Sequence, residues 1–350
     1  MGPPTVTDTG GGTTGDGTGA PERRTHRWWT VWARTLAGFA VLAAVVWWYP
    51  VEAFTDAVEA VDVRGALAAL GIGSVTTTLS AARWRTVACG VGLRLPLRRA
   101  VADYYLAVFL NAVLPAGVLG DVHRAFSHGR YSGDMGRGVR AVVLERMAGQ
   151  AVLAATGAAL LFVLPAALLG PGLRAVGVTA GMVAAVALVL AVGLRVGRSR
   201  RPRWWRALRA AEADARAGLF ARGPRVVVLS AAALAGYVSL FLVASRLAGV
   251  TAPALQLVPL LVLALLAMSL PVNVGGWGPR EAVTALAFGA AGLGSREGLT
   301  VSVVYGLLAL VAALPGAVVL LARLVRRRQV PGEGLHEGGE QGPPLGGRGQ

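Results

Sequence analysis

The sequence is poor in the residues that build covalent cross-links, metal sites and catalytic centres. It has one cysteine, Cys89, which excludes an internal disulfide and the paired-cysteine spacing of metal sites. Its four histidines, at positions 26, 123, 128 and 336, do not pair as ligands on an obvious helix face. No Ser-His-Asp order, two-carboxylate motif or glycine-lysine phosphate loop is present. We therefore expect no catalytic set, no metal and no cofactor, and a protein that is not an enzyme.

Lysine is absent as well, so all 34 basic residues are arginine, against 18 acidic residues. The resulting net charge of +16 would suit a nucleic-acid partner. The arginines, however, cluster beside apolar segments, where they set the orientation of a membrane protein. No module that combines aromatic and basic residues accompanies them. We expect membrane lipids as partners, with an anionic head group, and no nucleic acid.

Long apolar runs are the most abundant feature of the chain, which is 55% hydrophobic and 15% charged. A run of ~20 apolar residues crosses the hydrocarbon core of a bilayer. Six such runs lie near residues 32–49, 66–82, 141–163, 175–194, 226–248 and 299–322. The polar, glycine-rich ends, 1–26 and 329–350, are expected to be disordered tails. Residues 27–328 are therefore predicted to form an all-α membrane domain.

Two stretches, one in each half of that domain, share the pattern Leu-Pro-x-x-Val-x-Gly-x-x-x-Arg. They run from Leu114 to Arg124 and from Leu270 to Arg280, and each interrupts an apolar segment. Broken helices leave backbone groups unpaired, so they must face protein or a water-filled cavity. Matched breaks in two halves of a membrane protein point to the binding site of a transporter.

The distribution of arginine predicts the topology, because short cytoplasmic loops carry the excess of positive charge. The N-terminal flank, segment 83–99 and the ten-arginine stretch 195–225 are predicted to lie inside, and the acidic loop 50–65 outside. The chain end after Arg323 is also predicted to lie inside. Both termini are therefore expected in the cytoplasm.

This topology leaves the two broken segments entering and leaving the membrane by the same face. Each half, 30–164 and 174–325, then contains three spans and one re-entrant hairpin, in opposite orientation. The sequence therefore predicts an inverted-repeat helical bundle with about six spanning helices and two hairpins. Eight full spans are the alternative.

The motif residues carry a resemblance to a known family. They are Asn111, Pro115, Gly120, Asp121 and Arg124 in the first half, the Val143–Arg146 stretch that follows, and Leu270, Pro271, Gly276, Gly278, Arg280 and Glu281 in the second. With them the chain resembles, over about residues 30–325, the lysylphosphatidylglycerol synthase transmembrane region, also called the flippase-like family. Leu119 is a departure, since many members have a second glycine there.

The resemblance implies a bundle of about eight helices in the bacterial plasma membrane, linked to moving lipids between leaflets. Some members of the family add a soluble domain that attaches an amino acid to phosphatidylglycerol. After Arg328 this sequence continues as a polar tail, so we do not expect aminoacyl transfer.

Arg280 and Glu281 are candidate substrate-binding residues, because they open the helix that follows the second break. A helix N-terminus favours an anion, and the arginine fork suits phosphate. The alternative is a structural pair that locks the hairpin.

Asp121 and Arg124 hold the matching place in the first half. Asp121 could instead cap the returning helix. Glu145 and Arg146 are expected to pair with hairpin charges, for example Glu145 with Arg124, and a buried structural pair is the alternative.

The remaining candidates are polar or flexible positions at the breaks. Asn111 and Asn273 can hydrogen-bond backbone groups that a broken helix leaves free, which favours a structural use. Gly276 and Gly278 let the backbone turn and can offer N–H groups to a ligand.

We expect a protein that binds and translocates an anionic phospholipid or lipid-linked molecule between leaflets. A membrane-embedded transferase of head groups or sugars is the first alternative, although the only long loop, 195–225, lacks an acid–base pair. The second alternative is an accessory partner of a separate lipid-modifying or glycosyl-transferring synthase.

Overall fold

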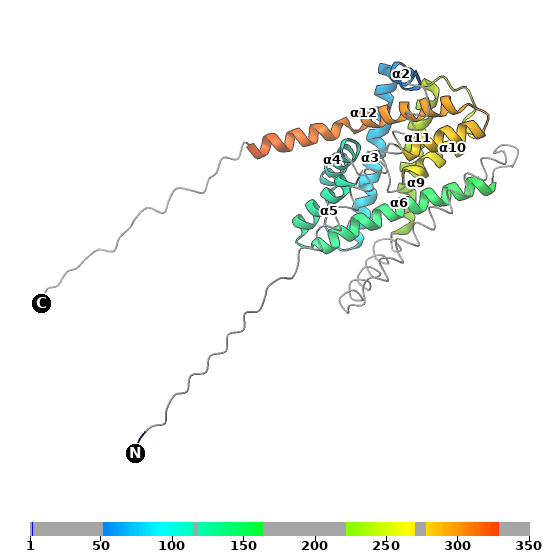
Figure 1. The fold of residues 1–350 in the computed structure, drawn as a ribbon. Helices are drawn as coiled ribbons and strands as arrows, with labels where there is room; N and C mark the ends of the chain where they lie inside the picture. Colours follow the sequence, from blue (N-terminus) through cyan, green and yellow to red (C-terminus); the bar gives the residue numbers. More distant parts are fainter. Residues whose placement is uncertain (1, 3–51, 115–117, 164–221, 270–277, 329–350) are drawn as a thin grey trace.

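A computed structural model describes residues 52–114, 118–163, 222–269 and 278–328, besides Gly2. Helices are the only regular structure in these residues, as expected for an all-α membrane protein. In chain order they are α2 (Glu52–Glu59), α3 (Val63–Gly90), α4 (Leu97–Val113), α5 (Leu119–Ser132), α6 (Met135–Val163), α9 (Gly223–Leu247), α10 (Ala254–Met268), α11 (Pro279–Ala290) and α12 (Ser295–Arg328). Figure 1 shows their arrangement.

Three of these helices, α3, α9 and α12, are long and apolar enough to span a membrane. Helix α6 has 29 residues, at the place of the expected span 141–163. The expected spans 32–49 and 175–194 and both predicted tails lie outside the described residues. The acidic segment 50–65, expected to be a loop, contains helix α2.

Both predicted helix breaks are present at the expected places. Helix α4 gives way at Leu114, whose ψ of 140° is extended; the residue before a proline is pushed out of the helical region by the proline ring. In the second half, α10 is followed by α11, which begins at Pro279, where a fixed φ favours the first helical turn. The two arms of each hairpin, α4 with α5 and α10 with α11, pack on each other.

Helix α3 is longer than its apolar run, which corrects one sequence-based assignment. The segment 83–99 was predicted to be a cytoplasmic flank, but α3 continues to Gly90 and buries Arg83. The buried positions Thr76, Ser80 and Arg83 follow one another at helical spacing. They form a polar stripe on one face of an apolar helix. Arg83 is therefore part of α3 and faces the interior of the bundle.

The helices of the first half contact one another as those of the second half do. Helices α4–α5, α5–α6, α3–α4 and α3–α6 pack together, and so do α10–α11, α11–α12, α9–α10 and α9–α12. The contacts between halves also come in pairs, because α4 and α3 pack on α12 while α10 and α9 pack on α6. In Figure 1, α12 crosses the upper part of the α3–α9 pair and α6 the lower part, and the two helices run in opposite directions.

The crossing of α3 and α9 brings together residues that have the same rank in their helices. Thr76 and Gly236 each stand fourteenth in their helix, and a Cβ at position 236 would collide with the Thr76 hydroxyl. Gly157 of α6 packs against Val262 and Leu266, the ninth and thirteenth residues of α10. Gly316 of α12 packs against Tyr105 and Phe109, the ninth and thirteenth residues of α4.

Candidate functional site

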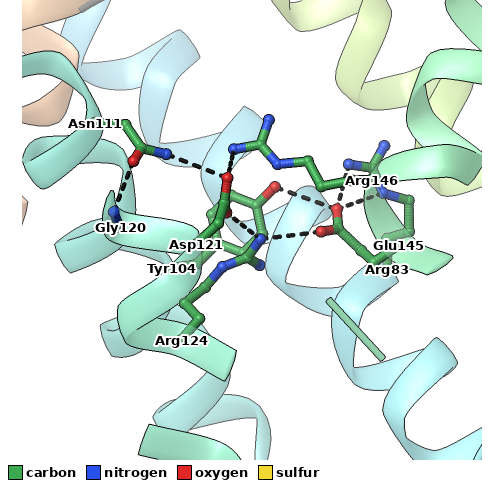
Figure 2. A network of polar contacts seen from close by, with 8 residues as sticks. All are labelled: Arg83, Tyr104, Asn111, Gly120, Asp121, Arg124, Glu145 and Arg146. Carbon is green, nitrogen blue, oxygen red and sulfur yellow. Dashed lines mark hydrogen bonds and ion pairs between the residues drawn. The ribbon is translucent and has the colours of Figure 1, made fainter. Parts of the chain in front are cut away.

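The first hairpin and the helices beside it hold a buried network of charged side chains (Figure 2). At its centre is Glu145 of α6, which is fully buried. Its Oε1 accepts hydrogen bonds from the Arg83 Nε at 3.0 Å and the Tyr104 hydroxyl at 3.2 Å, and its Oε2 accepts from the Arg124 Nη2 at 3.1 Å. Arg83 also donates to Ser230 of α9 at 3.3 Å. Five helices, four of the first half and α9 of the second, therefore meet at the Glu145 carboxylate and the Arg83 guanidinium.

Asp121 forms the second carboxylate of this network. It accepts a hydrogen bond from the Arg124 Nη2 at 2.6 Å and is paired with Arg146. The residue that caps α5 is Val118, without a side-chain hydrogen bond, so the predicted alternative of Asp121 as a helix cap is wrong. Asp121 instead links α5 to α6, and the expected pairing of Glu145 with Arg124 is confirmed.

Asn111 stabilises the break between α4 and α5. Its Oδ1 accepts a hydrogen bond from the Gly120 N–H at 2.7 Å, and its Nδ2 donates to the Asp121 Oδ2 at 3.4 Å. The first of these bonds satisfies a backbone donor that the start of α5 leaves free. The structural use expected for Asn111 is confirmed, and the same side chain orients Asp121.

Arg124 is held on two sides by aromatic rings and has donors to spare. Its guanidinium carbon lies 4.2 Å from the Tyr104 ring centroid and 4.8 Å from that of Trp84, a range in which cations are attracted to ring faces. Its side chain is fully buried, and its Nε and Nη1 have no hydrogen-bond partner. Arg146, in contrast, is 46% exposed. The network thus combines a buried cation with an accessible one.

The second hairpin holds a smaller cluster, built on Arg280 and Glu281 of α11. Both are buried and paired with each other. Ser302 of α12 accepts from the Arg280 Nε at 2.9 Å and donates to the Glu281 Oε1 at 3.3 Å. The Arg280 guanidinium lies 5.1 Å from the centroid of the Tyr305 ring.

Gly278 starts α11 in a conformation that only glycine adopts readily. Its φ is +110°, and its N–H donates to the Glu281 Oε2 at 2.6 Å. The turn expected at Gly278 is confirmed, and the same geometry gives Glu281 a structural contact. The predicted site residues Asn273 and Gly276 lie outside the described residues.

Sequence reasoning missed Arg83, Tyr104, Ser302 and Tyr305. The buried polar stripe of α3 would have indicated Arg83. The other three residues carry no local signal, because their role depends on which helices pack together. Within the described residues, no group of three or more His, Cys, Asp and Glu side chains is arranged to hold a metal ion.

The arrangement suits the binding of an anion in an apolar setting. Charged groups inside a membrane protein are costly and usually mark a substrate or ion pathway. The guanidinium fork matches the geometry of phosphate and carboxylate oxygens.

Comparison with known proteins identifies the family. No curated protein matches the chain. The family profile described as "Lysylphosphatidylglycerol synthase TM region" matches residues 35–325, most of the chain. Taken with the described helices, three of them long and apolar enough to span a membrane, this match means that the chain is a multi-pass membrane protein and belongs to the lysylphosphatidylglycerol synthase transmembrane-region family.

Proposed function

We propose that this protein translocates an anionic phospholipid or lipid-linked molecule between the two leaflets of the bacterial plasma membrane. The observation that carries the proposal is the network around Glu145, a set of guanidinium and carboxylate groups at the centre of an apolar bundle. Glu145 is the eleventh residue of α6, about 15 Å along the helix from its start. The expected span 141–163 begins four residues before Glu145, so the network lies inside the membrane segment of α6.

The paired helix contacts support an inverted-topology repeat, in which α3, α4, α5 and α6 correspond to α9, α10, α11 and α12. When two repeats are related by a two-fold axis, a residue of one repeat can contact the corresponding residue of the other only if both lie beside that axis. Thr76 and Gly236 meet in this way, so we place the axis at the crossing of α3 and α9. Repeats of this kind rock against each other around a site near the midplane.

Within this scheme the two hairpins have different roles. Arg124 and Arg146 of the first half bind the head group, because they offer unpaired or accessible donors. Arg280 and Glu281 hold the second hairpin in position through Ser302 and Gly278. The protein performs no covalent chemistry in this proposal, and both termini lie in the cytoplasm.

Reconstitution into liposomes tests the function. Fluorescent phospholipids in the inner leaflet should become accessible to an external quencher faster in proteoliposomes than in empty liposomes. Arg124→Gln should slow this movement at least tenfold, because hydrogen bonds to a charged group contribute ~1.5–3 kcal/mol.

The matched control is Arg296→Gln, which removes an exposed arginine paired with Asp56 and should leave the rate unchanged. Movement that is equally fast in Arg124→Gln would contradict the proposed site. A wild-type protein that moves no lipid, yet is recovered in complex with a lipid-modifying enzyme, would favour the accessory role.

A further inference from the structure

The network around Glu145 carries an unbalanced charge. Its cations are Arg83, Arg124 and Arg146, and its anions are Asp121 and Glu145. Among the residues that the structure describes, the site therefore has one positive charge in excess. In the second cluster, Arg280 and Glu281 balance each other. An unbalanced charge in a low-dielectric interior is unfavourable until an opposite charge arrives.

The described helices packed around the network do not supply that opposite charge. Helix α10 has no charged residue, and α9 has arginines only near its ends. Helix α12 has one acid, Glu297, in its first turn. The opposite end of α12 is the part that meets α4, where Arg323, twenty-six residues after Glu297, pairs with Asp103. Segments 115–117 and 270–277, beside the two breaks in the sequence, contain no ionisable residue.

Unpaired donors occur where the charge is in excess. The Nε and Nη1 of Arg124 are buried and have no partner, and Arg124 faces Asp121 and Glu145 only through its Nη2. An unmade hydrogen bond of a buried donor costs about 1–3 kcal/mol, more when the group is charged. The Nε–H points to the side of Nη2, and Nη1 lies on the side of Cδ, so each of these two nitrogens can donate separately to an oxygen of an anion.

An exposed apolar surface flanks the accessible side of the network. Four apolar side chains there are about half exposed. Val143 and Met147 lie on α6 on either side of Arg146 in sequence, and Val122 and Phe126 lie on α5, which packs against α6. Hydrocarbon chains fit such a surface, whereas a free inorganic anion gains nothing from it. The ligand should therefore join one negative charge to acyl chains.

We infer that the site around Arg124 and Arg146 selects lipids with a singly charged phosphodiester head group. This inference rests on the proposed function. A phosphodiester has one negative charge, which matches the single excess charge, and its non-bridging oxygens can accept hydrogen bonds from the unpaired donors of Arg124. A zwitterionic head group adds a cation that finds no acceptor, and a diphosphate brings more negative charge than the site balances.

Lipid binding to the purified full-length protein in detergent tests the inference. Native mass spectrometry would compare three dioleoyl lipids with matched chains: phosphatidylglycerol, phosphatidylcholine and diacylglycerol pyrophosphate. We expect phosphatidylglycerol to be retained about tenfold more than either of the others, which corresponds to one charged hydrogen bond.

Two variants change the charge of the site in opposite directions. Arg146→Gln makes the site neutral and should abolish the preference for phosphatidylglycerol over phosphatidylcholine. Asp121→Asn raises the excess to two and should increase retention of diacylglycerol pyrophosphate about tenfold. The control is Arg137→Gln, which removes the same charge from an exposed ion pair with Asp134 and should leave all three ratios unchanged.

The outcomes separate this inference from the proposed function. Equal retention of the three lipids, or ratios that Arg146→Gln and Arg137→Gln change alike, would overturn the inference even if the protein moves lipids. Selective retention of phosphatidylglycerol without any lipid movement in liposomes would support the charge assignment and overturn translocation.

Discussion

Glu145 accepts hydrogen bonds from side chains of three helices other than its own. Arg83 lies on α3, Tyr104 on α4 and Arg124 on α5. Two guanidinium groups compensate the charge of this fully buried carboxylate. Because the donors come from separate helices, Glu145 fixes how these helices sit relative to α6 as well as the charge of the site.

Replacement of Glu145 by glutamine should strongly destabilise the protein. The change keeps the size of the side chain but leaves Arg83 without its carboxylate and Arg124 with Asp121 alone, and loss of one partner of a buried ion pair costs about 3–5 kcal/mol. The thermal denaturation midpoint in detergent measures the effect. Asp134→Asn is the control, since its exposed pair with Arg137 is worth about 1 kcal/mol or less. Equal midpoints for the two variants would show that Glu145 does not hold the helices together.

The shared motif ends in an arginine in both of its copies, and these two arginines pair with carboxylates at different places in the chain. Arg124 is paired with Glu145, 21 residues further along the chain on another helix. Arg280 is paired with its neighbour Glu281 and reaches the next helix through Ser302. The same motif therefore places a guanidinium at both hairpins. In the first hairpin, the Nε and Nη1 of Arg124 have no partner among the described residues.

At the scale of helices, glycines set how closely each long helix approaches the opposite hairpin. A Cβ at Gly157 would lie 2.8 Å from the Leu266 Cδ1, the flexible end of a side chain. A Cβ at Gly316 would meet the backbone carbonyl of Tyr105 and the Cβ of Phe109. The first neighbour can move aside, whereas the second pair is fixed to the backbone of α4.

We expect Gly157→Ala and Gly316→Ala to have opposite effects on stability. Alanine in a helix interior is favoured over glycine by up to about 1 kcal/mol, so Gly157→Ala should be neutral or slightly stabilising. Gly316→Ala should destabilise by about 1–3 kcal/mol, the range for overpacking. The thermal denaturation midpoints in detergent compare the two variants directly. A midpoint that falls more in Gly157→Ala than in Gly316→Ala would contradict the packing described for both helices.

The sequence predicted the helix breaks better than the helix ends. Pro115 and Pro279 act on their own neighbours, so the breaks after α4 and before α11 were readable from local chemistry. The end of α3 was harder to predict, because Arg83 after an apolar run resembles a loop residue, and its helical spacing from Thr76 and Ser80 becomes decisive only once its partner is known. That partner, Glu145, is 62 residues away. The contact of Tyr104 with Glu145 likewise depends on packing between helices, which no local pattern encodes.

At the scale of the whole molecule, the predicted orientation can be tested by labelling. In a Cys89→Ser background, Thr251→Cys lies between α9 and α10, and Arg137→Cys lies in the first turn of α6; both positions are exposed. A membrane-impermeant maleimide should label position 251 on intact cells and position 137 only after permeabilisation, because arginine-rich ends stay inside. The Cys89→Ser protein itself should remain unlabelled. Labelling of both positions from outside would rule out the predicted topology.

The crossing of α3 and α9 should act as the pivot of the proposed rocking motion. A Cβ at position 236 would lie 3.2 Å from the Thr76 Cβ, slightly less than the ~3.5–4.5 Å spanned by a disulfide. Thr76→Cys with Gly236→Cys, in the Cys89→Ser background, should therefore form a disulfide after a small separation of the helices. Because points on a rotation axis do not move apart, lipid movement should continue in the oxidised protein.

A second pair of cysteines, far from that axis, provides the contrast. Asp103 of α4 and Arg323 of α12 form an ion pair near the end of α12, and their replacement by cysteines removes both partners together. Arg99, which also pairs with Asp103, is partly exposed, so water can solvate its charge. A short bismaleimide that joins these cysteines should arrest lipid movement, since α4 and α12 belong to different halves and must shift against each other. Each protein serves as its own control before cross-linking. If the disulfide at positions 76 and 236 arrests movement as completely as the α4–α12 cross-link, the axis does not pass between α3 and α9, and the two halves do not move as rigid bodies around that crossing.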